Sequence, residues 1–179
     1  MDSNKTFFII SLDNLMSMGK RLRATIYKIN KTFSECDFML CDTVNRFNIM
    51  MLDKNLSEKE ATQIALQNGN DWLQNNQKIL SELTIPSKII RWNKWLEHED
   101  FTSKLKIIET EYNNNLECKN AFDKTAKVFL SRRGVELESN LNQCIMYLQE
   151  ECAVMLLWAD YGYNFELYTS KRNHAMEYT

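Results

Sequence analysis

Three short apolar runs in the first half of the chain, separated by helical patterns, constrain the fold more than any other feature. The runs cover residues 7–11, 37–42 and 87–92, and each has the length and composition of a buried strand. Amphipathic helical patterns cover residues 15–34 and 57–83 between them. Because strands that alternate with helices pair in parallel, the order predicts an α/β sandwich, a mostly parallel sheet flanked by helices.

The second half of the chain is predicted to be mainly helical. Helical patterns occupy residues 99–114, 116–132 and 138–160, and a last strand is predicted at residues 163–168. Only four glycines and one proline interrupt the whole chain, which favours long helices and short loops. With 179 residues and neither an internal repeat nor a linker, we expect a single domain over residues 1–179.

The long helical patterns carry recognisable local signals. The first helix places an apolar stripe on one face, formed by Leu15, Met18, Leu22, Ile26, Ile29 and Phe33. The second begins with Ser57 and Glu60 in the spacing of a capping box. Gly69 is expected to weaken the middle of that helix.

The composition indicates the cellular compartment of the protein. The five cysteines are odd in number and form no C-x-x-C pair, which favours free thiols in a reducing cytoplasm. No apolar run approaches the roughly 18–20 residues of a membrane span. The start, MDSNKTFFIIS, also lacks the basic region and cleavage site of a signal peptide. We therefore expect a cytoplasmic protein without a membrane partner, and a monomer.

Ser11 stands where a buried strand ends and a helix is predicted to follow. In parallel sheets, reactive groups gather at the carboxyl ends of the strands. The spacing alone fits two interpretations, a helix N-cap or a nucleophile. The chain has only two histidines, His98 and His174, and no G-x-S-x-G elbow, which argues against a Ser-His-Asp triad. A nucleophilic Ser11 would therefore need a substrate that is already activated.

Tyr147 and Glu151 lie four residues apart and so share one face of the predicted helix at 138–160. They could be a surface pair. However, Glu151 lies among apolar residues, and a carboxylate in such surroundings usually has a cationic partner. That partner could be an arginine of this chain or the amino group of a ligand.

Five positive charges on the first helix face away from its apolar stripe. No Asp or Glu occurs between Asn14 and Ser34, whereas an ordinary solvated face mixes both signs. An unopposed positive field suits a phosphate backbone, although the net charge of the chain is −2. The residues of this basic face are Lys20, Arg21, Arg23, Lys28 and Lys31.

No motif for a metal or a nucleotide cofactor is present. The histidines and cysteines match no zinc-ligand spacing. No P-loop or G-x-G-x-x-G sequence occurs either, so we expect neither a metal nor a cofactor.

Five fragments, taken in order, resemble the tRNA-dependent cyclodipeptide synthases. They are IISLDN, LCDTVNRFN, AKVFLSRRG, YLQEECAV and FELY. The resemblance implies a Rossmann-like domain similar to the catalytic domain of class I tyrosyl- and tryptophanyl-tRNA synthetases. It also implies an aminoacyltransferase that consumes two aminoacyl-tRNAs and makes a cyclic dipeptide, a diketopiperazine. An aminoacyl ester is already activated, which would explain a serine without a histidine base.

The same resemblance implies roles for individual residues. Ser11 would accept the first aminoacyl group as an acyl-enzyme, while Tyr147 and Glu151 would hold its α-amino group. Tyr168 would relay a proton during dipeptide formation or cyclisation, with Tyr163 as a rival for that role.

Other matched positions would bind substrate or support the site. Asn14 would position the substrate, and Phe7 and Ile9 are expected to line the pocket for the first aminoacyl group. Asp42 and Arg46 are interpreted as framework at a strand end.

The tRNA surface is harder to place by resemblance. The family's tRNA-binding helix is rich in Lys and Arg, whereas residues 57–83 carry only Lys59 and Lys78 against four acidic residues. We therefore expect the basic face of the first helix to bind tRNA. The alternative surfaces are Lys88, Arg91 and Lys94, or Arg132 and Arg133. Two other functions stay open, a relative that binds aminoacyl-tRNA or another partner without turnover, and a structural or effector protein.

Overall fold

A parallel sheet forms the centre of the computed structural model, which describes residues 4–12, 14–161, 163, 165–168 and 172–178. Within them, the strands pair in parallel in the order β3-β2-β1-β4. Their bounds are β1 Lys5–Ser11, β2 Glu35–Cys41, β3 Ile89–Arg91 and β4 Phe165–Leu167. The register places Ser11 beside Cys41, so both strands end at one edge of the sheet. The predicted α/β fold with a parallel sheet is confirmed.

Most of the remaining described residues lie in helices. Their bounds are α1 Gly19–Thr32, α2 Arg46–Leu52, α3 Glu58–Leu80, α4 Trp92–Leu96, α5 Phe101–Asn114, α6 Leu116–Arg133, α7 Leu137–Trp158 and α8 His174–Tyr178. Three short 3-10 turns are η1 Leu15–Ser17, η2 Thr43–Asn45 and η3 Ala159–Tyr161. The long helices match the predicted ones, whereas the short helices α2, α4 and α8 had no prediction.

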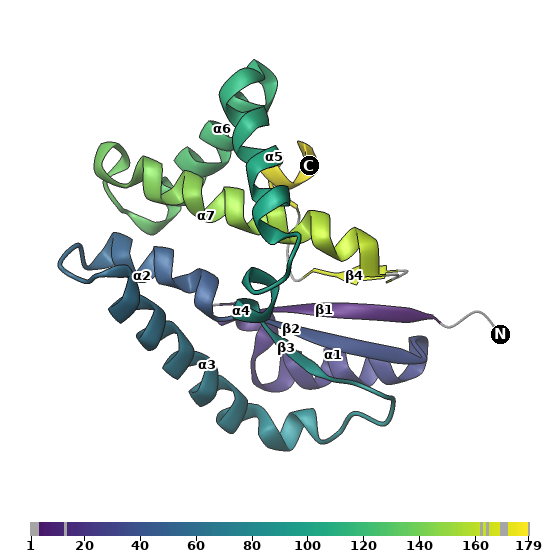
Figure 1. Ribbon diagram of the computed structural model, residues 1–179. Coiled ribbons are helices and arrows are strands. Elements are labelled where there is room, and N and C mark those ends of the chain that lie inside the picture. The colour runs from purple at the N-terminus through teal and green to yellow at the C-terminus, as the bar shows by residue number, and fades with distance from the viewer. Residues whose placement is uncertain (1–3, 13, 162, 164, 169–171, 179) are drawn as a thin grey trace.

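Helices cover both faces of the sheet. On one face, α1 and α3 bury an apolar cluster that includes Phe8, Ile26 and Trp72. On the other face, a second cluster joins strand residues such as Ile9 to α2, α4 and α7. Figure 1 shows α7 passing between the sheet and the helices α5 and α6. Because α7 is covered on both sides, most of its second half is buried, including the polar residues Gln149, Glu150 and Glu151.

The first helix begins later than predicted. It starts at Gly19, after a separate 3-10 turn, and Leu15 and Met18 are exposed rather than part of a buried stripe. The side chain of Asn14 caps the 3-10 turn by accepting a hydrogen bond from Met16 N. The N-cap residue of α1, Met18, makes no side-chain cap. The interpretation of Ser11 as a helix cap is therefore wrong.

The capping box at the start of α3 is confirmed, since Ser57 and Glu60 bond to each other's backbone N–H groups. Gly69, in the middle of α3, has a packing role. A Cβ there would lie 2.7 Å from Asp42 Oδ2 and 2.8 Å from Arg91 Nη2. These two side chains form an ion pair beneath the helix. Glycine is thus required for α3 to approach this pair closely.

Replacing Gly69 by alanine is expected to destabilise the protein, although alanine favours helices. The added methyl group must displace a buried ion pair, so the free energy of unfolding should fall by about 1–3 kcal/mol. Asn68→Ala, at the exposed neighbouring position, is the matched control and should be neutral or slightly stabilising. Urea unfolding of both variants checks this, and equal stability of the two would contradict the packing role.

Two further sequence expectations concern the chain as a whole. All five cysteines are free thiols, as predicted. Among the described residues, no helix is long and apolar enough to span a bilayer.

Candidate active site

A cavity of about 570 Å³ opens at the carboxyl edge of β1 and β2. Ser11 and Asn14 reach it from the end of β1, and Cys41 reaches it from the end of β2. Tyr147 and Glu151 reach it from α7, which crosses that face of the sheet. The predicted serine, tyrosine and glutamate therefore line one cavity, although more than 130 residues separate Ser11 from Tyr147 in the sequence.

Glu151 is a carboxyl group held out of water. Only 7% of its surface is exposed, and this burial raises the pKa of Glu151 to about 7. Hydrogen bonds with Tyr147, at 3.4 Å, and with Tyr168 partly oppose that rise, whereas the nearby Glu166 adds to it. A carboxyl group with a pKa near neutrality can exchange a proton with an amine at physiological pH.

Tyr147 is fixed by aromatic packing. Its ring stacks on Phe129 from α6 and meets Phe47 from α2 edge to face. Burial, followed by the charge of Glu151, raises the pKa of Tyr147 well above its usual value. The phenol therefore stays protonated and can donate a hydrogen bond to the carboxylate.

The cationic partner expected beside Glu151 belongs to its neighbour. Arg46 forms a buried ion pair with Glu150, whereas no Lys or Arg of the described residues pairs with Glu151. Of the two partners left open by the sequence, no arginine of the described residues is paired with Glu151, and the amino group of a ligand stays a prediction.

Several solved cyclodipeptide synthase structures are similar to this chain. A cyclodipeptide synthase from Fluoribacter dumoffii is 32% identical with a TM-score of 0.92, and the match covers 98% of this chain and 80% of that one. This chain belongs to the cyclodipeptide synthase family. No protein-family model matches it, and neither does any curated protein sequence.

More distant members of the cyclodipeptide synthase family share the fold. The enzyme from Bacillus thermoamylovorans is 12% identical with a TM-score of 0.74, covering 93% of this chain and 76% of its own. AlbC from Streptomyces noursei is 13% identical with a TM-score of 0.65, and the match covers 98% of both chains. A Mycobacterium tuberculosis member is described as related to type I tRNA synthetases, which agrees with the predicted Rossmann-like fold.

Phe7 and Ile9, the two residues expected to line the pocket for the first aminoacyl group, differ in position. Ile9 lines the cavity together with Tyr168. Phe7 lies outside the lining and packs edge to face against Trp158 and Tyr163. The hydroxyl of Tyr163 donates a 2.8 Å hydrogen bond to Asp37, in the first half of β2. Of the two rival tyrosines, Tyr168 is the one at the cavity.

The cavity has a cationic rim, which we define as Arg132, Arg133 and Arg172. Arg132 and Arg133 end α6, and Arg172 pairs with Glu166. The sequence had offered the first two only as an alternative tRNA surface.

His174 also lines the cavity, and sequence reasoning did not place it there. It begins α8, and its side chain is 50% exposed with Nδ1 3.5 Å from Glu177. No pattern signals this position, because His174 follows the last strand in a short helix. His98 lies elsewhere, against Tyr161.

The basic face of α1 is exposed but not wholly unopposed. Arg23 forms an ion pair with Glu82, just beyond α3, at 2.9 Å. Lys31 lies over the ring of Tyr27. Since α1 runs back from the carboxyl edge of the sheet, Lys20 and Arg21 lie nearest to that edge. Lys28 and Lys31 are about 12–17 Å further along the helix.

Asp42 and Arg46, which the sequence analysis interprets as framework, both bind other side chains of the protein. Asp42 is fully buried, caps η2 through Thr43 N and pairs with Arg91. Arg46 binds Glu150, so both residues have internal partners. Among the residues described, no group of three His, Cys, Asp or Glu side chains could hold a metal ion.

Proposed function

We propose that this protein is an aminoacyltransferase that joins the aminoacyl groups of two aminoacyl-tRNAs into a cyclic dipeptide. The observation that carries the proposal is the meeting of Ser11, Tyr147, Glu151 and Tyr168 in one cavity of a cyclodipeptide synthase fold. A structurally similar protein is named cyclo(L-leucyl-L-phenylalanyl) synthase. A volume of about 570 Å³ lies in the range of small-molecule sites and suits an aminoacyl group on a terminal adenosine.

In the first step, the Ser11 oxygen attacks the carbonyl carbon of the aminoacyl ester. The bond between that carbon and the ribose oxygen breaks, and the ribose hydroxyl takes the serine proton. The products are an aminoacyl ester of Ser11 and free tRNA. The step needs no strong base, because an ester is exchanged for an ester.

In the second step, the α-amino group on Ser11 attacks the ester of a second aminoacyl-tRNA. An ammonium group must first lose a proton, and α-amino groups have a pKa of about 8. Glu151, with a pKa of about 7, is close enough in acidity to take that proton. A peptide bond forms, the second tRNA leaves with a protonated ribose hydroxyl, and a dipeptidyl ester remains on Ser11.

In the third step, the free amino group of the dipeptide attacks the Ser11 ester and closes the ring. The bond between the carbonyl carbon and the Ser11 oxygen breaks, and the serine recovers its proton. Tyr168 lies at the cavity beside Glu151 and relays this proton. Two aminoacyl-tRNAs are thus converted into one cyclic dipeptide and two tRNAs.

The direct test is mass spectrometry of the medium from cells that overproduce the protein. We expect new compounds whose masses equal two amino acid residues joined as a ring, and none from cells that produce the Ser11→Ala variant. If wild-type protein makes no such compound in several hosts yet still binds aminoacyl-tRNA, it is a non-catalytic binder.

The tRNA is proposed to lie across the cavity mouth, with the cationic rim and the basic face of α1 as its phosphate partners. Exposed arginines and lysines without base-reading partners bind the backbone irrespective of sequence. Arg132 and Arg172 stand at the mouth, while Lys20 and Arg21 lie at the near end of α1.

Charge reversal separates these two surfaces. Each lost phosphate contact should flatten the dependence of log affinity on log salt by roughly 0.7–0.9. Lys20→Glu with Arg21→Glu should therefore flatten it by about 1.5, and Arg132→Glu should flatten it further. Binding is measured in the Ser11→Ala background by gel shift at several salt concentrations. Glu variants that keep both affinity and slope would place the tRNA on another surface.

A further inference from the structure

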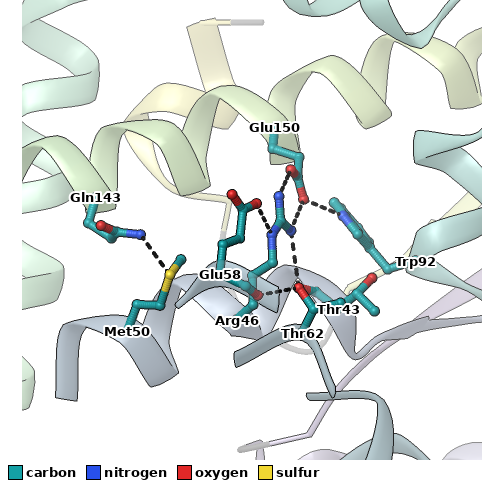
Figure 2. Close-up of polar contacts among 8 residues, drawn as sticks. All are labelled: Thr43, Arg46, Met50, Glu58, Thr62, Trp92, Gln143 and Glu150. Atoms are coloured by element: carbon teal, nitrogen blue, oxygen red, sulfur yellow. Dashed lines mark hydrogen bonds and ion pairs between the residues drawn. The ribbon is translucent and has the colours of Figure 1, made fainter. Parts of the chain in front are cut away.

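Arg46 and Glu150 form a buried contact that ties α7 to the elements beneath it. The Arg46 guanidinium donates to both carboxylate oxygens of Glu150, at 2.8 and 2.5 Å, as Figure 2 shows. Its Nε donates to Glu58 at 2.9 Å, and Nη1 also donates to the Thr43 carbonyl at 3.1 Å. Trp92 Nε1 completes the set by donating to Glu150 at 2.8 Å. Arg46 of α2 and Trp92 of α4 thus both bind one side chain of α7, while Glu58 of α3 and Thr43 of η2 hold the Arg46 guanidinium in place.

Net stabilisation of the fold alone does not explain a buried ion pair between Arg46 and Glu150. Arg46 and Glu150 are both more than nine-tenths buried, so each has lost most of its hydration. Removing two charges from water costs several kcal/mol per ion, and apolar residues of similar size often replace such pairs without loss. The two parallel N–H···O bonds fix the orientation of the Glu150 carboxylate. An apolar contact would not fix that orientation.

The orientation of the Glu150 side chain affects the site because Glu150 is the immediate neighbour of Glu151. Consecutive helical side chains point about 100° apart, so fixing the rotation of α7 at Glu150 also fixes where Glu151 points. The residue after Arg46, Phe47, meets the ring of Tyr147 edge to face. We propose that Arg46 and Glu150 are positioning residues, which hold α7 so that Glu151 and Tyr147 face the cavity. This inference rests on the proposed function.

The pair also has an electrostatic consequence for Glu151. Arg46 neutralises a carboxylate on the residue next to it. The other titratable groups that act on or beside Glu151 are Tyr147, Cys144, Cys41, Tyr168, Glu166 and, near Tyr147, Arg133. If Arg46 is lost while Glu150 stays, an uncompensated negative charge favours the protonated form of Glu151.

Three variants distinguish the effect of Arg46 on the orientation of α7 from its effect on the charge of Glu150. Arg46→Lys keeps the charge but loses the two parallel bonds, and Arg46→Met leaves Glu150 uncompensated. Arg46→Met with Glu150→Leu removes both charges and keeps the volume. Lys5→Met, which removes ion pairs with Glu35 and Asp37 and a contact with the Tyr163 ring at the opposite edge of the sheet, is the control.

The expected results differ for each variant. The double variant should still fold, with a small loss of stability because the buried Trp92 N–H loses its acceptor. Its kcat should fall about 10- to 100-fold, because misplaced reacting groups cost about that much. Arg46→Lys should lie between it and wild type. In Arg46→Met the acidic limb of kcat/KM should move up by about one pH unit. In the double variant this limb should return to its wild-type position.

A double variant with wild-type kcat would overturn the positioning role, as would an equal loss in Lys5→Met. The pKa of the Glu151 carboxyl is also followed by ¹³C NMR, with the signal assigned by its absence in Glu151→Gln. This measurement needs no turnover. A shift in Arg46→Met that the double variant reverses supports the coupling even if no cyclic dipeptide forms, and an unmoved signal contradicts it.

Discussion

Replacing Ser11 by alanine is expected to abolish cyclic dipeptide formation and the covalent labelling of the protein by radioactive aminoacyl-tRNA. The hydroxyl oxygen is the atom that would carry both acyl intermediates, and the other residues of the cavity cannot replace it. Loss of a nucleophile that works in concert with its neighbours reduces turnover by at least about 1,000-fold. Quantitative mass spectrometry and filter-bound radioactivity measure the two losses.

Loss of activity in Ser11→Ala should not be caused by unfolding. Ser11 caps no helix, so the alanine variant should unfold with the same free energy as wild type. Ser34→Ala, at an exposed position before β2, is the matched control and should keep full activity. A Ser11→Ala protein that still made cyclic dipeptide at a comparable rate would exclude the acyl-enzyme mechanism. Retained labelling of the Ser11→Ala protein would instead place the aminoacyl group on another residue.

The sheet and the long helices could be predicted because their signals are local. A continuous apolar run marks β1 as buried on both faces, and Ser57 with Glu60 marks the start of α3. Helix periodicity was less reliable at the start of the first helix, where Leu15 and Met18 continue the apolar spacing but lie outside α1. Apolar spacing predicts which side chains would share a face if the helix continued. It does not predict the residue at which the helix begins or ends.

Contacts between distant segments had no such signal. Arg46 and Glu150 are 104 residues apart, and their pairing depends on how α7 crosses the sheet. For the same reason, the sequence could show that a carboxylate on α7 needed a cation, but not which of two adjacent glutamates would receive it. The short helices α2, α4 and α8 contain too few turns for a period to be recognised.

The depth of a residue along a strand explains the different positions of the two pocket candidates. Phe7, Ile9 and Ser11 alternate along β1 and so point to the same face of the sheet. At about 3.3 Å per residue, Ile9 lies one side-chain step from Ser11, whereas Phe7 lies about 13 Å from it. Trp158 covers the sheet at that depth. Alternation predicted the face correctly, but the length of the cavity depends on the helix above it.

Replacing Glu151 by glutamine is expected to lower kcat by about 100-fold or more, since general-base catalysis typically contributes that much. Glutamine keeps the size and one acceptor oxygen but cannot take a proton from the ammonium group. In wild type, the carboxylate is the active form. The kcat/KM should therefore rise with pH through a limb near pH 7, because burial raises the pKa of Glu151 to about 7. The variant should lose that limb.

Glu151→Gln should lower activity but raise the free energy of unfolding at pH 8. These opposite changes distinguish a catalytic Glu151 from a structural one. A carboxyl whose pKa is raised on folding binds its proton more tightly in the native state. Its contribution is complete below about pH 4.5 and is lost as pH rises through about 7. At pH 8 the buried charge therefore costs stability, and Glu151→Gln should unfold with about 1–3 kcal/mol more free energy than wild type. Glu138→Gln, on the exposed start of α7, should change neither property. A destabilised Glu151→Gln with normal activity per folded molecule would show that the carboxylate only supports the fold.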